Sequence, residues 1–305
     1  NRTTVEAFGL RRKDSDSQVL GTHENAIRIL GLSHDGKTLV SGGDDNLIKL
    51  WKIGQQKPTP SNYEQNVLRG HGSWIRGASF SSNNQALFSG GYDREIRFWN
   101  LNSKRNKIVI QSESQTVACE VSPKGDRLVT TTEDGKAKVW DTKTGKELAL
   151  LQDGHRFLST TAVVTPDGGT MFTAAGDNTV RVWDYRTGIE TKTINNTGLR
   201  SLMSLSRDGR RIATGESGED AIRIFDVQTG KLIQRLTPET QVMSGNDQSV
   251  GITTIALSDD GSYVIAGDSY GNCFLWEIEN QRLVANWRGH FTAVVSVNFT
   301  SGKVS

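Results

Sequence analysis

The sequence is poor in the features that mark membrane, secreted and nucleic-acid-binding proteins. Hydrophobic residues make up only 35% of it, and no apolar run approaches the length of about 20 residues that a membrane-spanning helix requires. Its two cysteines do not indicate a disulfide framework, and they favour a reducing, cytoplasmic compartment over secretion. Lys and Arg number 36 against 34 Asp and Glu, and the resulting net charge of +2 argues against nucleic-acid binding through bulk charge.

The sequence also lacks motifs of catalysis and of cofactor binding. Its 32 glycines fit tight turns, and no glycine-rich loop precedes a helix as a phosphate-binding motif requires. No carboxylate pair stands apart from the rest of the sequence, and the histidines are spread along the chain, whereas a metal site needs convergent ligands. We therefore predict no catalytic residue, no cofactor and no metal ion.

What the sequence does contain is an internal repeat that recurs about every 40 to 50 residues. Each copy runs from a Ser or Thr, through an Asp, into alternating apolar residues and a Trp, as in residues 41–51, 89–99 and 173–183. Pairs such as Asp35-Gly36 lie between short apolar runs and indicate tight hairpins, because Gly accepts positive φ without steric cost. Four short antiparallel strands per repeat predict a radial assembly of small sheets.

The repeat resembles that of the WD-repeat β-propeller family over residues 15–300. The resemblance rests on residues that recur in register, namely Gly70-His71, Ser89, Asp93 and Trp99-Asn100 in one repeat and Gly154-His155, Thr173, Asp177 and Trp183-Asp184 in another. It implies an all-β fold, a β-propeller of four-stranded antiparallel blades, and the count of six complete repeats and a seventh begun predicts a seven-bladed β-propeller. Residues 4–8 and 18–20 resemble third and fourth strands and residues 289–299 begin a seventh repeat, so we expect N- and C-terminal strands to close the last blade.

The extent of the repeat bears on domain organisation. It covers nearly the whole chain, so we expect residues 1–305 to form a single propeller domain. The sequence lacks an initiator Met and stops in the middle of a repeat. We therefore also expect the domain to belong to a longer, multidomain protein, in which an attached effector domain supplies the output.

Ser, His and Asp recur together, and this combination invites a catalytic interpretation. The family resemblance implies instead that they form, with the Trp, a buried hydrogen-bond chain inside each blade. An enzyme needs one such set, whereas this chain carries a full or nearly full set in at least three repeats, so we favour the structural interpretation. The expected network residues are His23, Ser41, Asp45, Trp51, His71, Ser89, Asp93, Trp99, His155, Thr173, Asp177 and Trp183.

The sixth repeat departs from this pattern. Ala266 stands where the Ser or Thr is expected, and Tyr270 stands where the Asp is expected. We therefore expect packing and strand pairing to hold this blade in place of the network.

The family resemblance also implies where a partner binds, namely at the top face of the propeller. The residues that project there lie three and five places after the His and one place before the Asp; they include Arg28, Asp44, Trp74, Arg76, Tyr92, Glu133 and Leu158. Trp, Tyr and Arg, the residue types enriched at interface hot spots, concentrate in the second repeat. Such a cluster suits a partner with an acidic or aromatic anchor. The alternative is that Trp74 packs on its neighbouring blade and the arginines are solvated.

These observations favour a non-catalytic protein–protein interaction module, a scaffold or sensor whose partner is a protein or peptide. One alternative is an enzyme or ligand-binding propeller that uses the central channel. Another is a nucleic-acid binder that uses a local patch of Arg28, Arg76, Arg94 and Arg97, although the balanced net charge opposes it. No membrane partner is expected.

Overall fold

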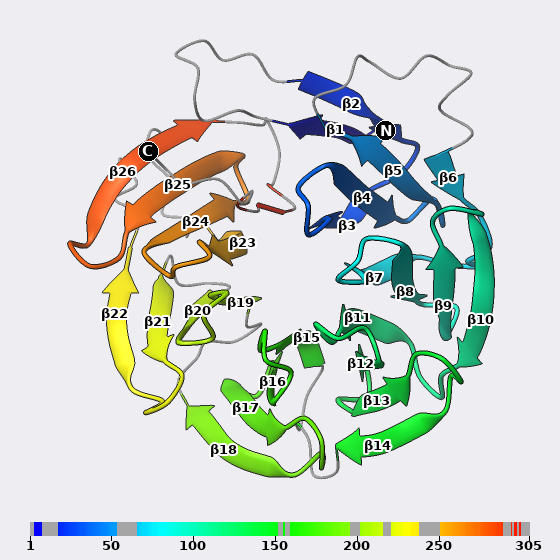
Figure 1. Cartoon of the computed structure of the whole chain (residues 1–305). Coiled ribbons are helices and arrows are strands. Elements are labelled where there is room, and N and C mark those ends of the chain that lie inside the picture. Colours follow the sequence, from blue (N-terminus) through cyan, green and yellow to red (C-terminus); the bar gives the residue numbers. More distant parts are fainter. Residues whose placement is uncertain are drawn as a thin grey trace. The chain divides into compact units, whose positions relative to one another are not determined.

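The computed structural model describes residues 3–7, 18–53, 66–151, 155, 159–195, 202–215, 221–237, 251–288, 294, 296–297 and 299. The regular elements of these residues are β-strands, which form six four-stranded sheets and one two-stranded sheet (Figure 1). The same residues contain no helix with the length and apolar character needed to span a lipid bilayer. The chain divides into two compact units, Asn1–Thr116 and Val117–Ser305.

The first compact unit contains a two-stranded sheet and two four-stranded sheets, which we call blade 1 and blade 2. The two-stranded sheet pairs β1 (Thr3–Ala7) with β2 (Gln18–His23). Blade 1 consists of β3 (Ile27–Leu32), β4 (Thr38–Gly43), β5 (Ile48–Lys52) and β6 (Val67–Leu68). Blade 2 consists of β7 (Ile75–Phe80), β8 (Ala86–Gly91), β9 (Glu95–Asn100) and β10 (Arg105–Gln111).

The second compact unit contains four sheets, blades 3 to 6. Blade 3 consists of β11 (Thr116–Val121, whose first residue belongs to the first unit), β12 (Arg127–Thr132), β13 (Ala137–Asp141) and β14 (Glu147–Leu151). Blade 4 consists of β15 (Ser159–Val164), β16 (Thr170–Ala175), β17 (Thr179–Asp184) and β18 (Glu190–Asn195). Blade 5 consists of β19 (Leu202–Leu205), β20 (Arg211–Gly215), β21 (Ile222–Asp226) and β22 (Leu232–Leu236). Blade 6 consists of β23 (Ile252–Leu257), β24 (Tyr263–Asp268), β25 (Asn272–Glu277) and β26 (Arg282–Arg288).

Each blade is a meander, with its strands in chain order (Figure 1). Most of its strands are joined by short, locally specified turns, whereas β5 and β6 of blade 1 are separated by residues 53–66. In the first turn of blade 1, the Ser33 hydroxyl donates to Asp35 Oδ1 at 2.6 Å, and the same oxygen accepts from the Lys37 backbone N–H at 3.1 Å. Gly36 follows with a φ of 68°, a conformation that residues with a Cβ seldom adopt. The Asp-Gly pair therefore forms the hairpin that the sequence predicts.

The hydrophobic core lies between the faces of neighbouring blades. In the first unit, Leu68 of blade 1 clusters with Ile75, Leu87 and Trp99 of blade 2. The aromatic residue that ends the repeat is buried in every blade, where it removes a large apolar surface from water: Trp51, Trp99, Trp140, Trp183, Phe225 and Trp276.

The fold class is confirmed as an all-β propeller of four-stranded antiparallel blades, whereas the number seven remains a prediction. The residues that the structure describes form six such blades. The N-terminal strands of the expected seventh blade are present as the antiparallel pair β1 and β2. The C-terminal segment 289–299 lies mostly outside the described residues, although the Val294 backbone N–H donates to the Asp268 carbonyl of blade 6 at 2.9 Å.

Candidate partner-binding site

A hydrogen-bonded chain of four side chains ties blade 2 together beneath the candidate site. His71 Nδ1 lies 2.7 Å from Asp93 Oδ2, and His71 Nε2 lies 2.7 Å from Ser89 Oγ. The Trp99 indole N–H donates to the same Ser89 oxygen at 2.8 Å. Ser89 has no exposed surface and its hydroxyl already bridges two rings, so it cannot reach a substrate as a nucleophile would.

The same chain occurs in two other blades. In blade 1, His23 contacts Asp45 at 2.8 Å and Ser41 at 2.6 Å, and the Trp51 indole donates to Ser41 at 2.7 Å. In blade 4, His155 contacts Asp177 at 3.0 Å and Thr173 at 2.9 Å, and the Trp183 indole donates to Thr173 at 2.9 Å. The structure thus brings together all twelve residues of the expected network, four in each of three blades.

The carboxylates of this network have displaced pKa values. Burial alone raises the pKa of the Asp93 carboxyl, but the hydrogen bond and charge of His71 and the backbone N–H groups of Glu95 and Gly72 outweigh it and lower that pKa. The pKa of Asp45 is lowered in the same way by His23 against the opposing effect of burial. In blade 4, burial lowers the pKa of His155, and Asp177 offsets only part of that effect.

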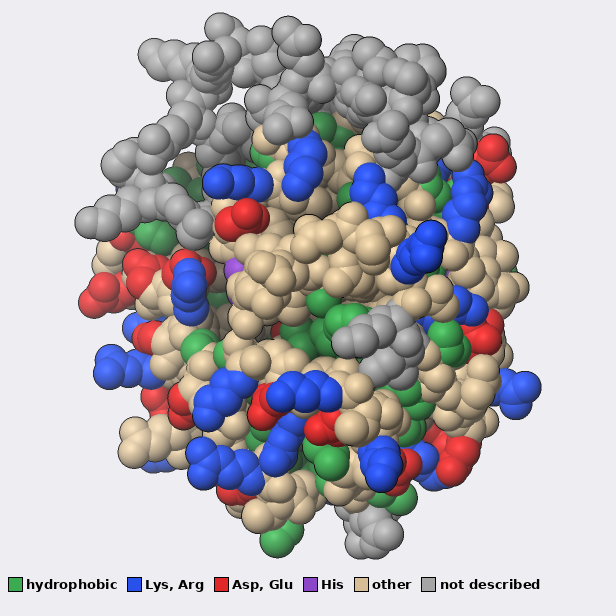
Figure 2. Space-filling model, turned by 45° about the vertical axis from the view of Figure 1, so that its right-hand side comes forward, with side chains coloured by type: hydrophobic (Ala, Val, Ile, Leu, Met, Phe, Trp, Pro, Cys, Tyr) green, Lys and Arg blue, Asp and Glu red, His purple; other side chains and the backbone are tan. Residues whose placement is uncertain are grey.

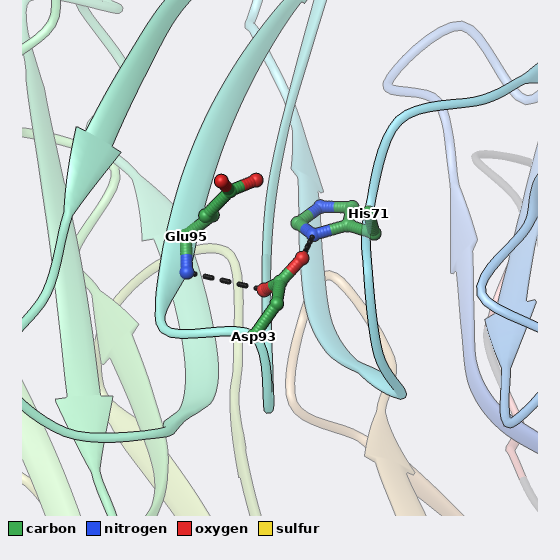
Figure 3. Close-up of side chains that lie close together, drawn as sticks. All are labelled: His71, Asp93 and Glu95. Atoms are coloured by element: carbon green, nitrogen blue, oxygen red, sulfur yellow. Dashed lines mark hydrogen bonds and ion pairs between the residues drawn. The ribbon is translucent and has the colours of Figure 1, made fainter.

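Two residues of the network and their neighbour Glu95 are of types that bind metal ions. His71, Asp93 and Glu95 offer ligand atoms within 4.8 Å of one another (Figure 3). These atoms already take part in hydrogen bonds. His71 Nδ1 is hydrogen-bonded to Asp93 Oδ2, and the Glu95 carboxylate accepts from Arg97 Nε at 2.8 Å. In Figure 3 the hydrogen bond drawn between Glu95 and Asp93 comes from the Glu95 backbone N–H, and no contact is drawn from the Glu95 carboxylate to His71 or Asp93. The donor types suit a metal ion, but these contacts favour a structural role, because they would have to break before the three residues could hold an ion.

Above the network, five side chains of blades 1 and 2 form a continuous surface group, which we call the aromatic–arginine cluster: Arg28, Asp44, Trp74, Arg76 and Tyr92. Trp74 stacks on Tyr92 with ring centroids 5.6 Å apart. The Arg28 guanidinium lies 5.8 Å from the Trp74 ring centroid, and the Arg76 guanidinium lies 4.9 Å from that of Tyr92. Both distances fall within the range of cation–π attraction.

The backbone of each blade holds these side chains in place. The Tyr92 N–H donates to the Trp74 carbonyl at 2.8 Å, which joins the start of β7 to the end of β8. A Cβ at Gly91 would lie 2.5 Å from that carbonyl oxygen, so this close approach requires glycine. In blade 1 the Asp44 N–H donates to the Ala26 carbonyl in the same way, at 3.0 Å. The two blades therefore present equivalent positions with different side chains.

The charges of the cluster are unevenly compensated. Arg28 donates to both carboxylate oxygens of Asp44, at 2.9 and 2.6 Å. Arg76 donates to the Tyr92 hydroxyl at 3.2 Å, and no carboxylate among the described residues lies within ion-pair distance of it. Trp74 is 42% exposed, which places a large apolar surface in contact with solvent. The cluster thus combines an exposed aromatic surface with one uncompensated positive charge.

The remaining predicted surface residues do not add to this cluster. Glu133 is partly exposed between β12 and β13 of the second compact unit, and Leu158 lies outside the described residues. Sequence reasoning listed Arg28 and Asp44 as separate binding residues and missed their pairing. The two residues occupy the positions that Arg76 and Tyr92 occupy in the next repeat, but this spacing alone does not show that the side chains at these positions meet.

Two of the four arginines of the patch considered for nucleic-acid binding are paired with carboxylates. Arg97 pairs with Glu95 and lies over the buried Trp99 ring at 5.8 Å from its centroid, and Arg28 pairs with Asp44. On the face that Figure 2 shows, Lys and Arg side chains lie among Asp and Glu side chains.

Comparison with known families agrees with the fold. A family model described as WD domain, G-beta repeat matches residues 15–52 and 62–100. A second model, described as outer membrane protein assembly factor BamB, matches residues 92–304, which is more than half of the chain. The chain belongs to the WD-repeat β-propeller family, and over residues 92–304 it also belongs to the family that the second model describes.

Curated relatives match parts of the chain. A guanine nucleotide-binding protein subunit beta from Oryza sativa subsp. indica is 25% identical over 190 residues, which cover 59% of this chain and 49% of the relative. The protein of the same name from subsp. japonica is 34% identical over 79 residues, which cover 26% of this chain and 20% of the relative. A WD repeat-containing protein from Dictyostelium discoideum is 30% identical over 88 residues, covering 29% of this chain and 13% of the relative. The chain thus spans about half the length of the first relative and less of the others. Propellers of this kind are typical of protein-interaction scaffolds.

Proposed function

We propose that the protein is a non-catalytic interaction module that binds a protein or peptide through the aromatic–arginine cluster. The observation that carries this proposal is the exposed Trp74 stacked on Tyr92 between two arginines, above a buried network that fixes both blades. Trp, Tyr and Arg dominate the hot spots of protein interfaces because each combines a large contact area with directed polar groups. The cluster meets this description on a rigid support.

The relatives give the proposal a second support. Two of them are named as beta subunits of guanine nucleotide-binding proteins, and a subunit works within an assembly of several chains. The buried hydroxyls of Ser41 and Ser89 favour a scaffold over an enzyme, because each is engaged by a His and a Trp. We further propose that the module acts in a reducing compartment and recruits partners for an effector domain in the full-length protein.

Affinity capture with matched baits tests the proposed binding site. The chain and its Trp74→Ala and Tyr92→Ala variants would be immobilised, and proteins captured from a lysate would be identified by mass spectrometry and their affinities measured. A hot-spot aromatic truncated to Ala costs about 2 kcal/mol, so we expect about thirtyfold weaker binding of the specific partner. Tyr270→Ala is the control, because it removes another exposed aromatic residue from blade 6. If every captured protein binds the Trp74→Ala bait as well as the parent, the site lies elsewhere.

We also propose that the propeller has seven blades, the last of which joins N- and C-terminal strands. The proposal is supported by the pairing of β1 with β2 and by the seventh repeat that starts at Gly289-His290. Deletion of residues 1–20 would then expose strand edges, and we expect aggregation and a lower melting temperature. Light scattering and thermal melts measure both. A monomeric deletion variant with the parent's melting temperature would show that these strands do not close the fold.

A further inference from the structure

We infer that the aromatic–arginine cluster recognises an acidic side chain of its partner, Asp or Glu. Arg76 alone binds the carboxylate of that side chain, whereas Arg28 positions Trp74. This inference rests on the proposed function. It specifies the chemistry of the partner. It also assigns different roles to the two arginines, although they occupy the same position in their repeats.

Arg28 is unsuited to bind an anion from outside. Its guanidinium donates to both oxygens of Asp44, and the Asp44 side chain is only 13% exposed. The hydrogen bond to Asp44 and the charge of that carboxylate also raise the pKa of Arg28, against the opposing effect of burial. An incoming carboxylate would have to compete with a bidentate partner that is already in place. Arg28 instead lies against the Trp74 ring, where it limits the positions the indole adopts.

Arg76 occupies the equivalent position in blade 2 but has a neutral partner. Its contacts among the described residues are the Tyr92 hydroxyl and the Tyr92 ring face, neither of which carries a negative charge. A guanidinium has five N–H donors in a planar fork that fits a carboxylate with two parallel hydrogen bonds. The described residues accept only one of these donors. Arg76 therefore retains both charge and hydrogen-bonding capacity for a ligand.

The other polar atoms of the cluster favour an acceptor as the ligand. The Trp74 indole N–H has no acceptor among the described residues, and the Tyr92 hydroxyl, which accepts from Arg76, still has its own O–H to donate. Asp44, the carboxylate of the cluster, is occupied by Arg28. A ligand that brings only acceptors, such as a carboxylate, satisfies these donors, whereas a cationic ligand would meet two guanidinium groups.

The distribution of charge favours an acidic peptide over a nucleic acid. Binding to a phosphate backbone depends on several cations acting together, each of which releases a counterion. Of the four arginines in this region, Arg28 and Arg97 are paired with carboxylates, which leaves Arg76 within the cluster and the exposed Arg94 two residues along the chain from Tyr92. One guanidinium next to a stacked Trp and Tyr instead fits a peptide that carries one acidic residue beside an apolar residue.

The test uses peptide display followed by a double-mutant comparison. Random 12-residue peptides would be selected on the immobilised chain and counter-selected on the Trp74→Ala variant. The best peptide would be labelled with fluorescein, and a second version would carry Asn or Gln in place of its acidic residue. Binding of both versions would be measured by fluorescence anisotropy to the parent, Arg76→Gln and Arg28→Gln. Arg207→Gln, an exposed arginine of blade 5, controls for the change in net charge.

We expect selected peptides to contain Asp or Glu beside a large apolar residue, and the amide version to bind the parent about tenfold more weakly. This difference should vanish in Arg76→Gln and persist in Arg28→Gln and Arg207→Gln. If Arg76→Gln does not fold, as judged by its thermal melt, Arg76→Lys should reduce the difference because it keeps the charge but loses the planar fork.

Several outcomes would overturn the inference while leaving the binding site intact. Selected peptides without an acidic preference, or a carboxylate effect that survives in Arg76→Gln, would do so. Binding of a labelled 12-nucleotide single strand that is lost in Arg76→Gln would assign the site to nucleic acid instead. If no peptide survives the counter-selection on Trp74→Ala, the proposed function itself fails.

Discussion

Blades 1 and 2 have the same interior and different surfaces. Their buried networks are alike, with His–Asp contacts of 2.8 and 2.7 Å and His–Ser contacts of 2.6 and 2.7 Å. At the surface, the arginine of blade 1 faces the carboxylate of Asp44, whereas the arginine of blade 2 faces the phenol of Tyr92. Two exchanges of side chain, Tyr92 for Asp44 and Trp74 for Ala26, thus separate a closed ion pair from an open cationic and aromatic surface.

The comparison shows that the surface side chains of a blade can differ while the buried network stays the same. The residue before the network Asp is held by its backbone in both blades, through the N–H of Asp44 or of Tyr92. Its side chain projects outward and takes no part in the network. The side chain at this position can therefore change while the network beneath it stays intact.

The largest effect that tests this comparison is on stability. Ser89→Ala leaves two buried groups without a partner, the His71 Nε2 and the Trp99 indole N–H. Each such group costs about 1 to 3 kcal/mol, so we expect several kcal/mol of lost stability in denaturant unfolding, and a similar loss for Ser41→Ala in blade 1. Partner affinity of the folded variants should stay unchanged. A turnover activity that disappears in a fully folded Ser89→Ala variant would contradict the scaffold role.

An intermediate effect is expected when the surface of one blade is converted to that of the other. Tyr92→Asp gives Arg76 the carboxylate partner that Arg28 has, and it should weaken binding of an acidic peptide about tenfold or more. Asp44→Asn removes the partner of Arg28 and should strengthen that binding a few-fold. Anisotropy titrations at two salt concentrations measure both changes. Equal affinities for parent, Tyr92→Asp and Asp44→Asn would mean that these partners do not control the charge of the site.

The smallest effect concerns pH, and it should be alike in the two blades. The pKa values of Asp45 and Asp93 are lowered in the folded protein from the ordinary 3.8, so both carboxyls stabilise the fold above that pH. As the pH falls below about 4, the unfolded chain binds protons first and this stability is lost. Melting temperatures between pH 6 and pH 3 should therefore fall less steeply for Asp45→Asn and Asp93→Asn than for the parent. A parallel decline in all three proteins would mean that neither carboxyl contributes.

The sequence predicted the buried networks because their members lie in register along the chain. The spacing of His71, Ser89 and Asp93 is the same as that of His23, Ser41 and Asp45. The two sets were therefore expected to have the same structural role. Because each repeat folds into the same strands and hairpins, residues at the same spacing take the same places in each blade. The members of the surface cluster were likewise found from their places in the repeat.

The sixth blade shows where this reasoning stops. Tyr270 stands at the Asp position of the repeat, but the carboxylate of that turn is supplied by Asp268, which has no exposed surface. Asp268 accepts from the Tyr270 and Asn272 backbone N–H groups, each at 2.8 Å, and from the Asn272 side-chain amide at 2.6 Å. Because Asp268 lies two residues before the Asp position of the repeat, comparing repeats position by position does not find it. Its role is seen only in the folded chain, where its carboxylate meets the N–H groups of Tyr270 and Asn272.

The sequence by itself determined the blade, its turns, its terminal aromatic residue and its His–Ser–Asp–Trp network, because these depend on contacts within one repeat of fixed spacing. Only the tertiary structure decided what the arginines do. Arg28 and Arg76 occupy equivalent positions in the sequence. The charge of Arg28 is compensated by the carboxylate of Asp44, whereas Arg76 lies over the phenol ring of Tyr92 and its charge is not compensated. The contact between Arg28 and Trp74 joins two blades, and such packing between repeats follows from the geometry of neighbouring sheets, which no single repeat encodes.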